Sequence, residues 1–77
     1  MIMQEQYQAI GESAGKVYKV LEGGTALTVK ALQREAGVAD AGLFNQALGW
    51  LAREGKLEFQ KRGNSCVISL VGAQAAI

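Results

Sequence analysis

The sequence lacks residues on which several classes of protein depend. Its 77 residues contain no histidine and a single cysteine. One cysteine excludes an internal disulfide framework, and a structural zinc site, which uses about four Cys or His ligands, is not expected. The absence of histidine also removes the base that most often activates a serine or cysteine nucleophile. We therefore expect no metal, no cofactor and no enzyme active site.

Strong net charge and long apolar segments are missing as well. Eight Lys and Arg residues against seven Asp and Glu leave a formal charge of +1, so no whole-molecule field draws the chain toward nucleic acid or anionic lipid. No segment approaches the roughly 18–20 apolar residues that span a bilayer, and the first residues lack a signal-peptide pattern. The sequence predicts a cytoplasmic protein without a membrane partner, whose charge-driven contacts depend on a local patch.

The residues that are present suit one small domain. Hydrophobic side chains make up 49% of the chain, and a chain this short buries only about 60% of its unfolded surface. We expect a single domain over residues 1–77, with a core in about 3–70 and an apolar tail at 71–77. Helical spacing of apolar residues predicts three helices, over 3–21, 29–36 and 41–54. Thr28 and Asp40 are the expected N-caps of the second and third helices.

After the third helix the apolar period changes from about 3.6 to two. This change predicts a β-hairpin over 57–70 with a glycine turn at 62–65. The run 25–27 is too short to stand alone but offers a third strand to the sheet. Cys66 lies on the inward side of its strand, so we expect a buried, inert thiol. The inward residues of the hairpin are Leu57, Phe59, Cys66, Ile68 and Leu70.

Three segments carry a resemblance to a known family. They read GESAGKVY at 11–18, TVKALQREAGV at 28–38 and ALGWLAREGKL at 47–57. Together they resemble a family of small bacterial winged helix-turn-helix domains of unknown function, over about residues 9–70. The resemblance implies an α+β fold of three helices and a hairpin wing. It also implies binding of double-stranded DNA, and so a role in transcription regulation, without identifying an operator.

In such a fold the helix 41–54 enters the major groove. With Phe44 turned inward, the helical repeat places five residues on its outer face: Gly42, Asn45, Gln46, Gly49 and Arg53. Asn45 and Gln46 suit an adenine edge, and Arg53 suits guanine or phosphate. Glycine has no side chain that could contact a base, so this face has few side chains for recognising a DNA sequence. The alternative is an ordinary solvated helix face.

Further cations are candidates for phosphate contacts. Lys61, Arg62 and Asn64 crowd the hairpin turn, with no acid between Phe59 and Val71, and suit phosphate or a minor groove. The same residue types also occur in turns that only contact solvent, and on edge strands, where charged side chains prevent pairing with another chain. The other candidates are Lys30, Arg34 and Lys56. Near-zero net charge favours the competing hypothesis, a winged-helix module that binds protein and not DNA.

One copy with so few cations would bind DNA weakly, which points to a homodimer. Gly11 and Gly15 each weaken the first helix by up to about 1 kcal/mol relative to alanine. Close approach of a backbone, from this domain or from a second copy, would explain them, and so would a locally weak helix. Trp50 fits a partly buried core position as well as an interface. The candidate dimer residues are Gly11, Gly15, Tyr18, Trp50 and Ile77.

Overall fold

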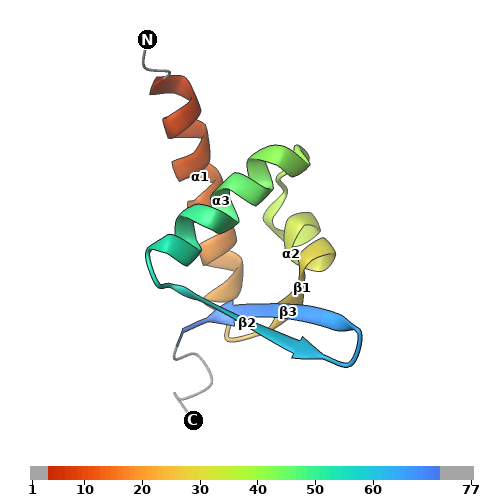
Figure 1. Cartoon of the computed structure of the whole chain (residues 1–77). Helices are drawn as coiled ribbons and strands as arrows, with labels where there is room; N and C mark the ends of the chain where they lie inside the picture. Colours follow the sequence, from red (N-terminus) through yellow and green to blue (C-terminus); the bar gives the residue numbers. More distant parts are fainter. Residues whose placement is uncertain (1–3, 72–77) are drawn as a thin grey trace.

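The computed structural model describes residues 4–71, which form three helices and a three-stranded sheet (Figure 1). The elements follow one another as α1 (Gln4–Leu21), β1 (Leu27–Thr28), α2 (Val29–Ala36), α3 (Ala41–Arg53), β2 (Leu57–Arg62) and β3 (Ser65–Leu70). This is the predicted α+β architecture of a winged helix-turn-helix, with the hairpin β2–β3 as the wing. None of the helices in the described range is long and apolar enough to cross a membrane.

The local signals for helix ends are confirmed. The Thr28 side chain accepts a hydrogen bond from the Ala31 N–H at 3.2 Å, and Asp40 accepts one from the Leu43 N–H at 3.0 Å. Each satisfies a backbone donor that the first helical turn leaves free. Gly37 ends α2 with a φ of 72°, a left-handed conformation that favours glycine. The third helix ends at Arg53, one residue earlier than predicted, with Glu54 as its C-cap.

The third strand exists, but it lies at Leu27–Thr28 and not at 25–27. It pairs antiparallel with β3, so the sheet order is β1-β3-β2 and β3 is central. Leu27 lies opposite Ile68, which is fully buried. Thr28 therefore ends a strand and caps α2 at the same position, which leaves no loop between the two elements.

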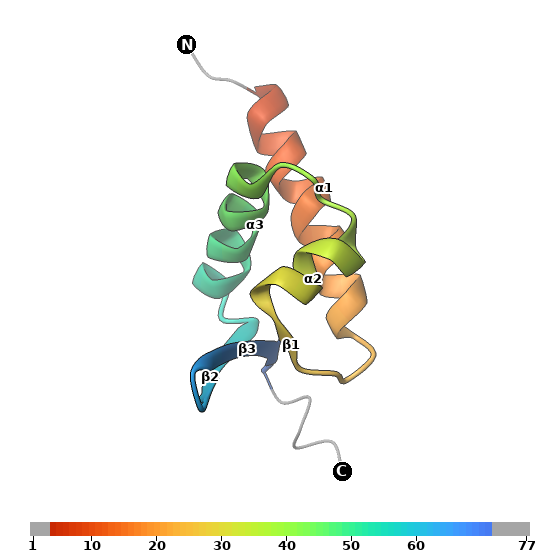
Figure 2. The same cartoon turned by 90° about the vertical axis from the view of Figure 1, so that its right-hand side faces the viewer.

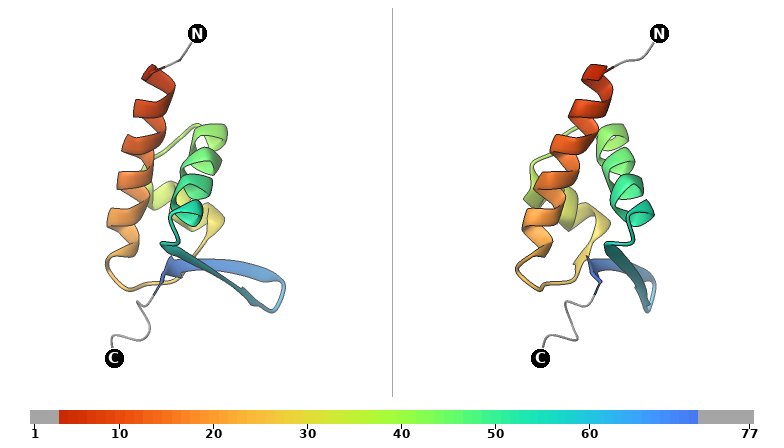
Figure 3. Two further views of the ribbon diagram at one scale, coloured as in Figure 1. Left: turned by 60° about the vertical axis from the view of Figure 1, so that its left-hand side comes forward. Right: turned by 90° about the vertical axis from the view of Figure 1, so that its left-hand side faces the viewer.

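The core lies where the three helices meet the sheet. Its fully buried large side chains come from all three helices and from β3: Val17, Leu21, Leu32, Phe44 and Ile68. The buried residues of α1 begin at Ser13, and the N-terminal end of α1 extends past the other helices (Figures 2 and 3). Tyr7 is one of the apolar residues whose helical spacing predicts the first helix with a buried face, but it is 62% exposed.

The hairpin keeps the predicted alternation but buries only part of it. Leu57 pairs with Leu70, Phe59 with Ile68, and Lys61 with Cys66, so these residues share the side of the sheet that includes the core residue Ile68. The turn end of the hairpin extends beyond the helices (Figures 1 and 3). Phe59 is consequently 50% exposed, and Cys66 is exposed. The prediction of a buried Cys66 is wrong, because the strand extends past the core that would cover it.

The two glycines of α1 face open space. No described heavy atom outside their own neighbourhood lies within 4 Å of a Cβ built on Gly11 or Gly15. Close approach by the described part of this domain is therefore excluded as their explanation. A second copy and a locally weak helix remain as alternatives.

Candidate nucleic-acid interface

The outer face of α3 is exposed where the helical repeat placed it. Its predicted residues all lie in solvent: Gly42, Asn45, Gln46, Gly49 and Arg53. The opposite face of α3 buries Phe44, Ala47, Leu48 and Leu51. This burial orients the helix with its polar side outward, so α3 can meet a groove without disturbing the core.

Gln46 already has a partner within the domain. Its Oε1 accepts a hydrogen bond of 2.8 Å from Gln6 Nε2, on the first turn of α1. A bidentate contact to an adenine edge uses both the oxygen and the amide nitrogen of a glutamine. Gln46 must therefore share its oxygen or give up the Gln6 bond to make that contact. Asn45, the exposed residue directly before Gln46, has no side-chain hydrogen bond among the contacts described that would compete with a base contact.

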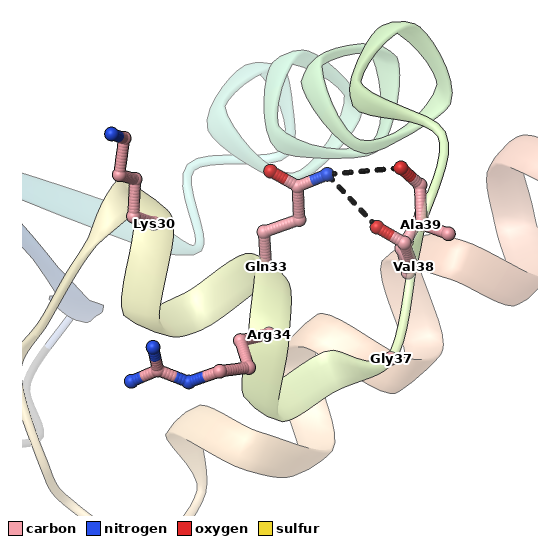
Figure 4. Close-up of a pocket in the computed structure, with 6 residues that line it drawn as sticks. All are labelled: Lys30, Gln33, Arg34, Gly37, Val38 and Ala39. Carbon is pink, nitrogen blue, oxygen red and sulfur yellow. Dashed lines mark hydrogen bonds between the residues drawn. The ribbon is translucent and has the colours of Figure 1, made fainter.

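The turn between α2 and α3 is held by Gln33, a residue that the sequence analysis missed. Its Nε2 donates to the backbone oxygens of Val38 at 3.0 Å and Ala39 at 3.3 Å (Figure 4). The backbone oxygen of Gln33 also accepts from the Gly37 N–H at 3.1 Å. The sequence signal that could have identified Gln33 was the turn between α2 and α3. Its carbonyl groups lie outside a helix, and such groups need hydrogen-bond partners when they are partly buried.

Two predicted cations extend from one side of α2. Figure 4 shows Lys30 and Arg34 pointing away from the α2–α3 turn, while Gln33 points toward it. Lys30 and Arg34 are exposed and line a shallow hollow with Gln33, Gly37, Val38 and Ala39. They lie four residues apart, about one helical turn, so they present two positive charges along the same edge of α2.

Lys30 also connects α2 to the wing. It lines a second hollow together with Thr28, Val29, Ser65 and Cys66. Lys61 lies directly opposite Cys66 in the hairpin and shares its side of the sheet. The structure thus places Lys30 beside the start of β3 at Ser65 and Cys66, and Lys61 opposite Cys66 on the neighbouring strand β2, which sequence spacing alone did not show. We call the surface formed by Lys30, Arg34, Lys61, Arg62, Ser65 and Cys66 the α2–wing surface.

The tip of the wing is a tight two-residue turn. Gly63 has a φ of +60°, whereas no residue other than glycine in the described range has a positive φ, so Gly63 and Asn64 have the φ signs of a type II′ hairpin turn. Arg62 and Asn64 are both exposed there. Arg62 makes a long contact of 3.4 Å with Gln60 Oε1 on its own strand. The tip therefore projects a guanidinium and an amide from a tight turn.

Lys56, the remaining predicted cation, lies elsewhere. Its Nζ is 5.6 Å from the centre of the Tyr18 ring on α1, a cation–π geometry. It lines a groove between α1 and α3 that we call the α1–α3 groove, formed by Ala14, Gly15, Tyr18, Trp50, Leu51, Glu54 and Lys56. The structure does not place Lys56 on the α2–wing surface.

The α1–α3 groove brings together three of the predicted dimer residues, Gly15, Tyr18 and Trp50. Trp50 is 50% exposed, so its interpretation as a core aromatic is wrong. It lies on the side of α3 that faces α1, where the groove leaves its ring in solvent. Gly11 is exposed one turn earlier on α1, and Ile77 lies outside the described residues.

No group of three or more His, Cys, Asp or Glu residues within 4–71 is placed to hold a metal ion.

Comparison with known proteins gives two findings. A family model described as a winged helix-turn-helix domain (DUF2582) matches residues 3–70. Uncharacterized protein MJ1608 of Methanocaldococcus jannaschii is 37% identical over an alignment of 70 residues, which covers 88% of this chain and 99% of that protein. That relative is archaeal, so the expectation of a purely bacterial family is not supported.

Proposed function

The chain belongs to the DUF2582 family of winged helix-turn-helix domains, and from this premise we propose that it binds double-stranded DNA. Winged helix-turn-helix domains typically do so, with the second helix of the motif in the major groove. In this chain that helix is α3, and the wing would lie against the neighbouring backbone. Transcription regulation in the cytoplasm is the role that such binding would serve. We propose a binding role and not catalysis, because a chain without histidine lacks the base that most often activates a serine or cysteine nucleophile.

The observation that carries the proposal is the position of the cations on the α2–wing surface. Lys30 lies beside Ser65 and Cys66 on β3, and Lys61 lies opposite Cys66 on β2, with Arg34 further along α2 and Arg62 at the tip. All four side chains are exposed. Phosphate contacts from such residues supply most of the affinity in sequence-independent binding. Four such contacts would give a slope of log K against log salt of about −4 per copy.

The test removes two cations from the wing. Fluorescence anisotropy of a labelled duplex is measured at about 50 and about 200 mM salt, for the native chain and for Lys61→Ala/Arg62→Ala. We expect binding that collapses as salt rises and a slope that falls by about 2 in the variant. Lys16→Ala/Lys19→Ala removes the same charge from exposed positions of α1 and, compared with the native chain at a concentration at which both have the same mass in solution, should leave the slope unchanged. Equal losses in both variants would contradict a specific role of the wing.

We further propose that two copies associate through the α1–α3 groove. The half-exposed Trp50 ring lies beside Gly15, above which the described chain leaves open space. The exposed side of α1 is acidic in its first half, at Glu5 and Glu12, and basic in its second, at Lys16 and Lys19. An antiparallel pair of α1 helices would set the acids of one copy beside the bases of the other, as an isologous two-fold interface requires.

The mass in solution tests this association. Light scattering at tens of micromolar should give about twice the 8.2 kDa of one chain. Trp50→Ser should lower the mass to that of one chain. The control is Phe59→Ser, because Phe59 is exposed to the same 50% but lies on the wing. A native mass near 8.2 kDa would contradict the dimer. A dimer that binds no duplex would favour the alternative function, a protein-interaction module.

A further inference from the structure

We infer that α3 discriminates only weakly between DNA sequences, and that this protein binds duplex DNA of any sequence mainly through the phosphates. The inference rests on the proposed function and names its substrate class. It follows from where the molecule places its hydrogen-bonding side chains and where it places its charge. Base edges are reached by side chains of the helix in the major groove, whereas phosphate contacts carry no direct sequence information.

The exposed side of α3 has few side chains that can form a hydrogen bond with a base. It consists of Ala41, Gly42, Asn45, Gln46, Gly49, Trp50, Ala52 and Arg53. Four of these eight are alanine or glycine, which offer no side-chain hydrogen bond. Trp50 is turned toward the α1–α3 groove. Three polar side chains remain for a helix of 13 residues.

Each of the three is limited by its position. Gln46 is bonded to Gln6 at 2.8 Å. Arg53 is the last residue of α3, about 18 Å along the helix axis from Ala41 at 1.5 Å per residue, whereas the N-terminal residues of such a helix contact the bases. Asn45 alone is near the start and without a described partner. The exposed carboxylate of Asp40, which caps α3, adds negative charge at the end that would approach the DNA.

Apart from Arg53 at the end of α3, the candidate cations for phosphate contacts lie on other elements. Lys30 and Arg34 extend from α2, and Lys61 and Arg62 from the wing. Cations on α2 and the wing would contact the DNA backbone beside the groove that α3 enters, and every sequence presents the same backbone charge. A single bidentate contact to a base discriminates by about 5- to 150-fold. With Asn45 as the one unrestricted candidate, the expected discrimination lies at or below the bottom of that range.

The experiment compares duplexes and variants side by side. The full chain is titrated into labelled duplexes of equal length that are A·T-rich, G·C-rich and mixed, and a random library is selected for binding. Asn45→Ala and Lys61→Ala are measured on the same panel. We expect dissociation constants within about fivefold of one another across the panel, no shared motif in the selected library, and a loss of affinity of at most about fivefold for Asn45→Ala on any duplex. Lys61→Ala should weaken binding of all duplexes to the same extent.

The outcomes separate the two proposals. Discrimination above about fivefold between duplexes, or a motif enriched from the library, would overturn this inference and leave DNA binding intact. Loss of discrimination in Asn45→Ala would then identify the side chain responsible. Failure of the native chain to bind any duplex at about 50 mM salt would overturn the proposed function itself, and the inference with it.

Discussion

The α2–wing surface and the α1–α3 groove both contain exposed lysines, in different surroundings. Lys30 lies beside Ser65 and Cys66, and Lys61 lies opposite Cys66 on the neighbouring strand. Lys56 lies 5.6 Å from the Tyr18 ring centre, in a groove that also contains Glu54 and Trp50. A lysine over an aromatic ring and near a carboxylate is partly satisfied within its own protein. The surroundings of a cation therefore indicate a phosphate surface better than a count of charges does.

The comparison also separates two kinds of partner. The α2–wing surface is polar, with its charges on a tight turn and on one edge of a short helix. The α1–α3 groove combines exposed aromatic rings, an uncovered glycine and charges of both signs, which suits a protein surface. A chain with a net charge of +1 therefore offers two distinct contact regions. The following variants either break this division or sharpen it.

The largest effect is expected from the core that supports both regions. Phe44→Ala removes a side chain that is 1% exposed and should cost about 3–5 kcal/mol. A domain of 77 residues is stable by about 4–12 kcal/mol, so much of its stability would be lost. Urea denaturation followed by circular dichroism measures the change. A loss below about 1 kcal/mol would mean that α3 is not anchored by this ring.

Gln33→Ala should affect one region and spare the other. The substitution leaves the Val38 and Ala39 carbonyls without their side-chain partner, at an expected cost of about 1–2 kcal/mol. A looser α2–α3 turn should weaken DNA binding in the anisotropy assay and leave the dimer mass unchanged. Gln8→Ala, at an exposed position on α1, is the control and should change stability by less than about 0.5 kcal/mol.

Two single lysine substitutions compare the regions directly. Lys30→Ala should reduce the slope of log K against log salt by about 1, because one phosphate contact is lost. Lys56→Ala removes the same charge from the α1–α3 groove and should leave the slope unchanged. Anisotropy over a series of salt concentrations measures both. A reduction of the same size in Lys56→Ala would place Lys56 on the DNA-binding surface after all.

The smallest effect is expected at Cys66. Because its side chain is exposed on the wing, Cys66→Ser should change the free energy of unfolding by less than about 0.5 kcal/mol. Ile68→Ser, two residues further at a position that is fully buried, should be strongly destabilising. Chemical denaturation of the two variants tests whether the core ends between these positions. A comparable loss of unfolding free energy in both variants would indicate that Cys66 is part of the core.

The sequence predicted nearly all element boundaries, because the signals for them are local. Thr28 and Asp40 accept hydrogen bonds from residues three positions ahead, and Gly37 and Gly63 supply positive φ where the chain turns. The outer face of α3 was also predictable, since one buried residue and the helical repeat place its neighbours. The third strand was displaced, because two residues carry no periodicity and their pairing depends on β3.

The tertiary structure alone decided which of these faces is covered and which residues from distant segments meet. Periodicity predicts the side on which Tyr7, Phe59 and Cys66 lie, but burial also requires that another element reach them, and none of the described elements covers them. The contact of Gln6 with Gln46 and the approach of Lys30 to the wing join residues far apart in the chain. Their positions follow from how the helices cross and where the hairpin ends, which no local pattern encodes.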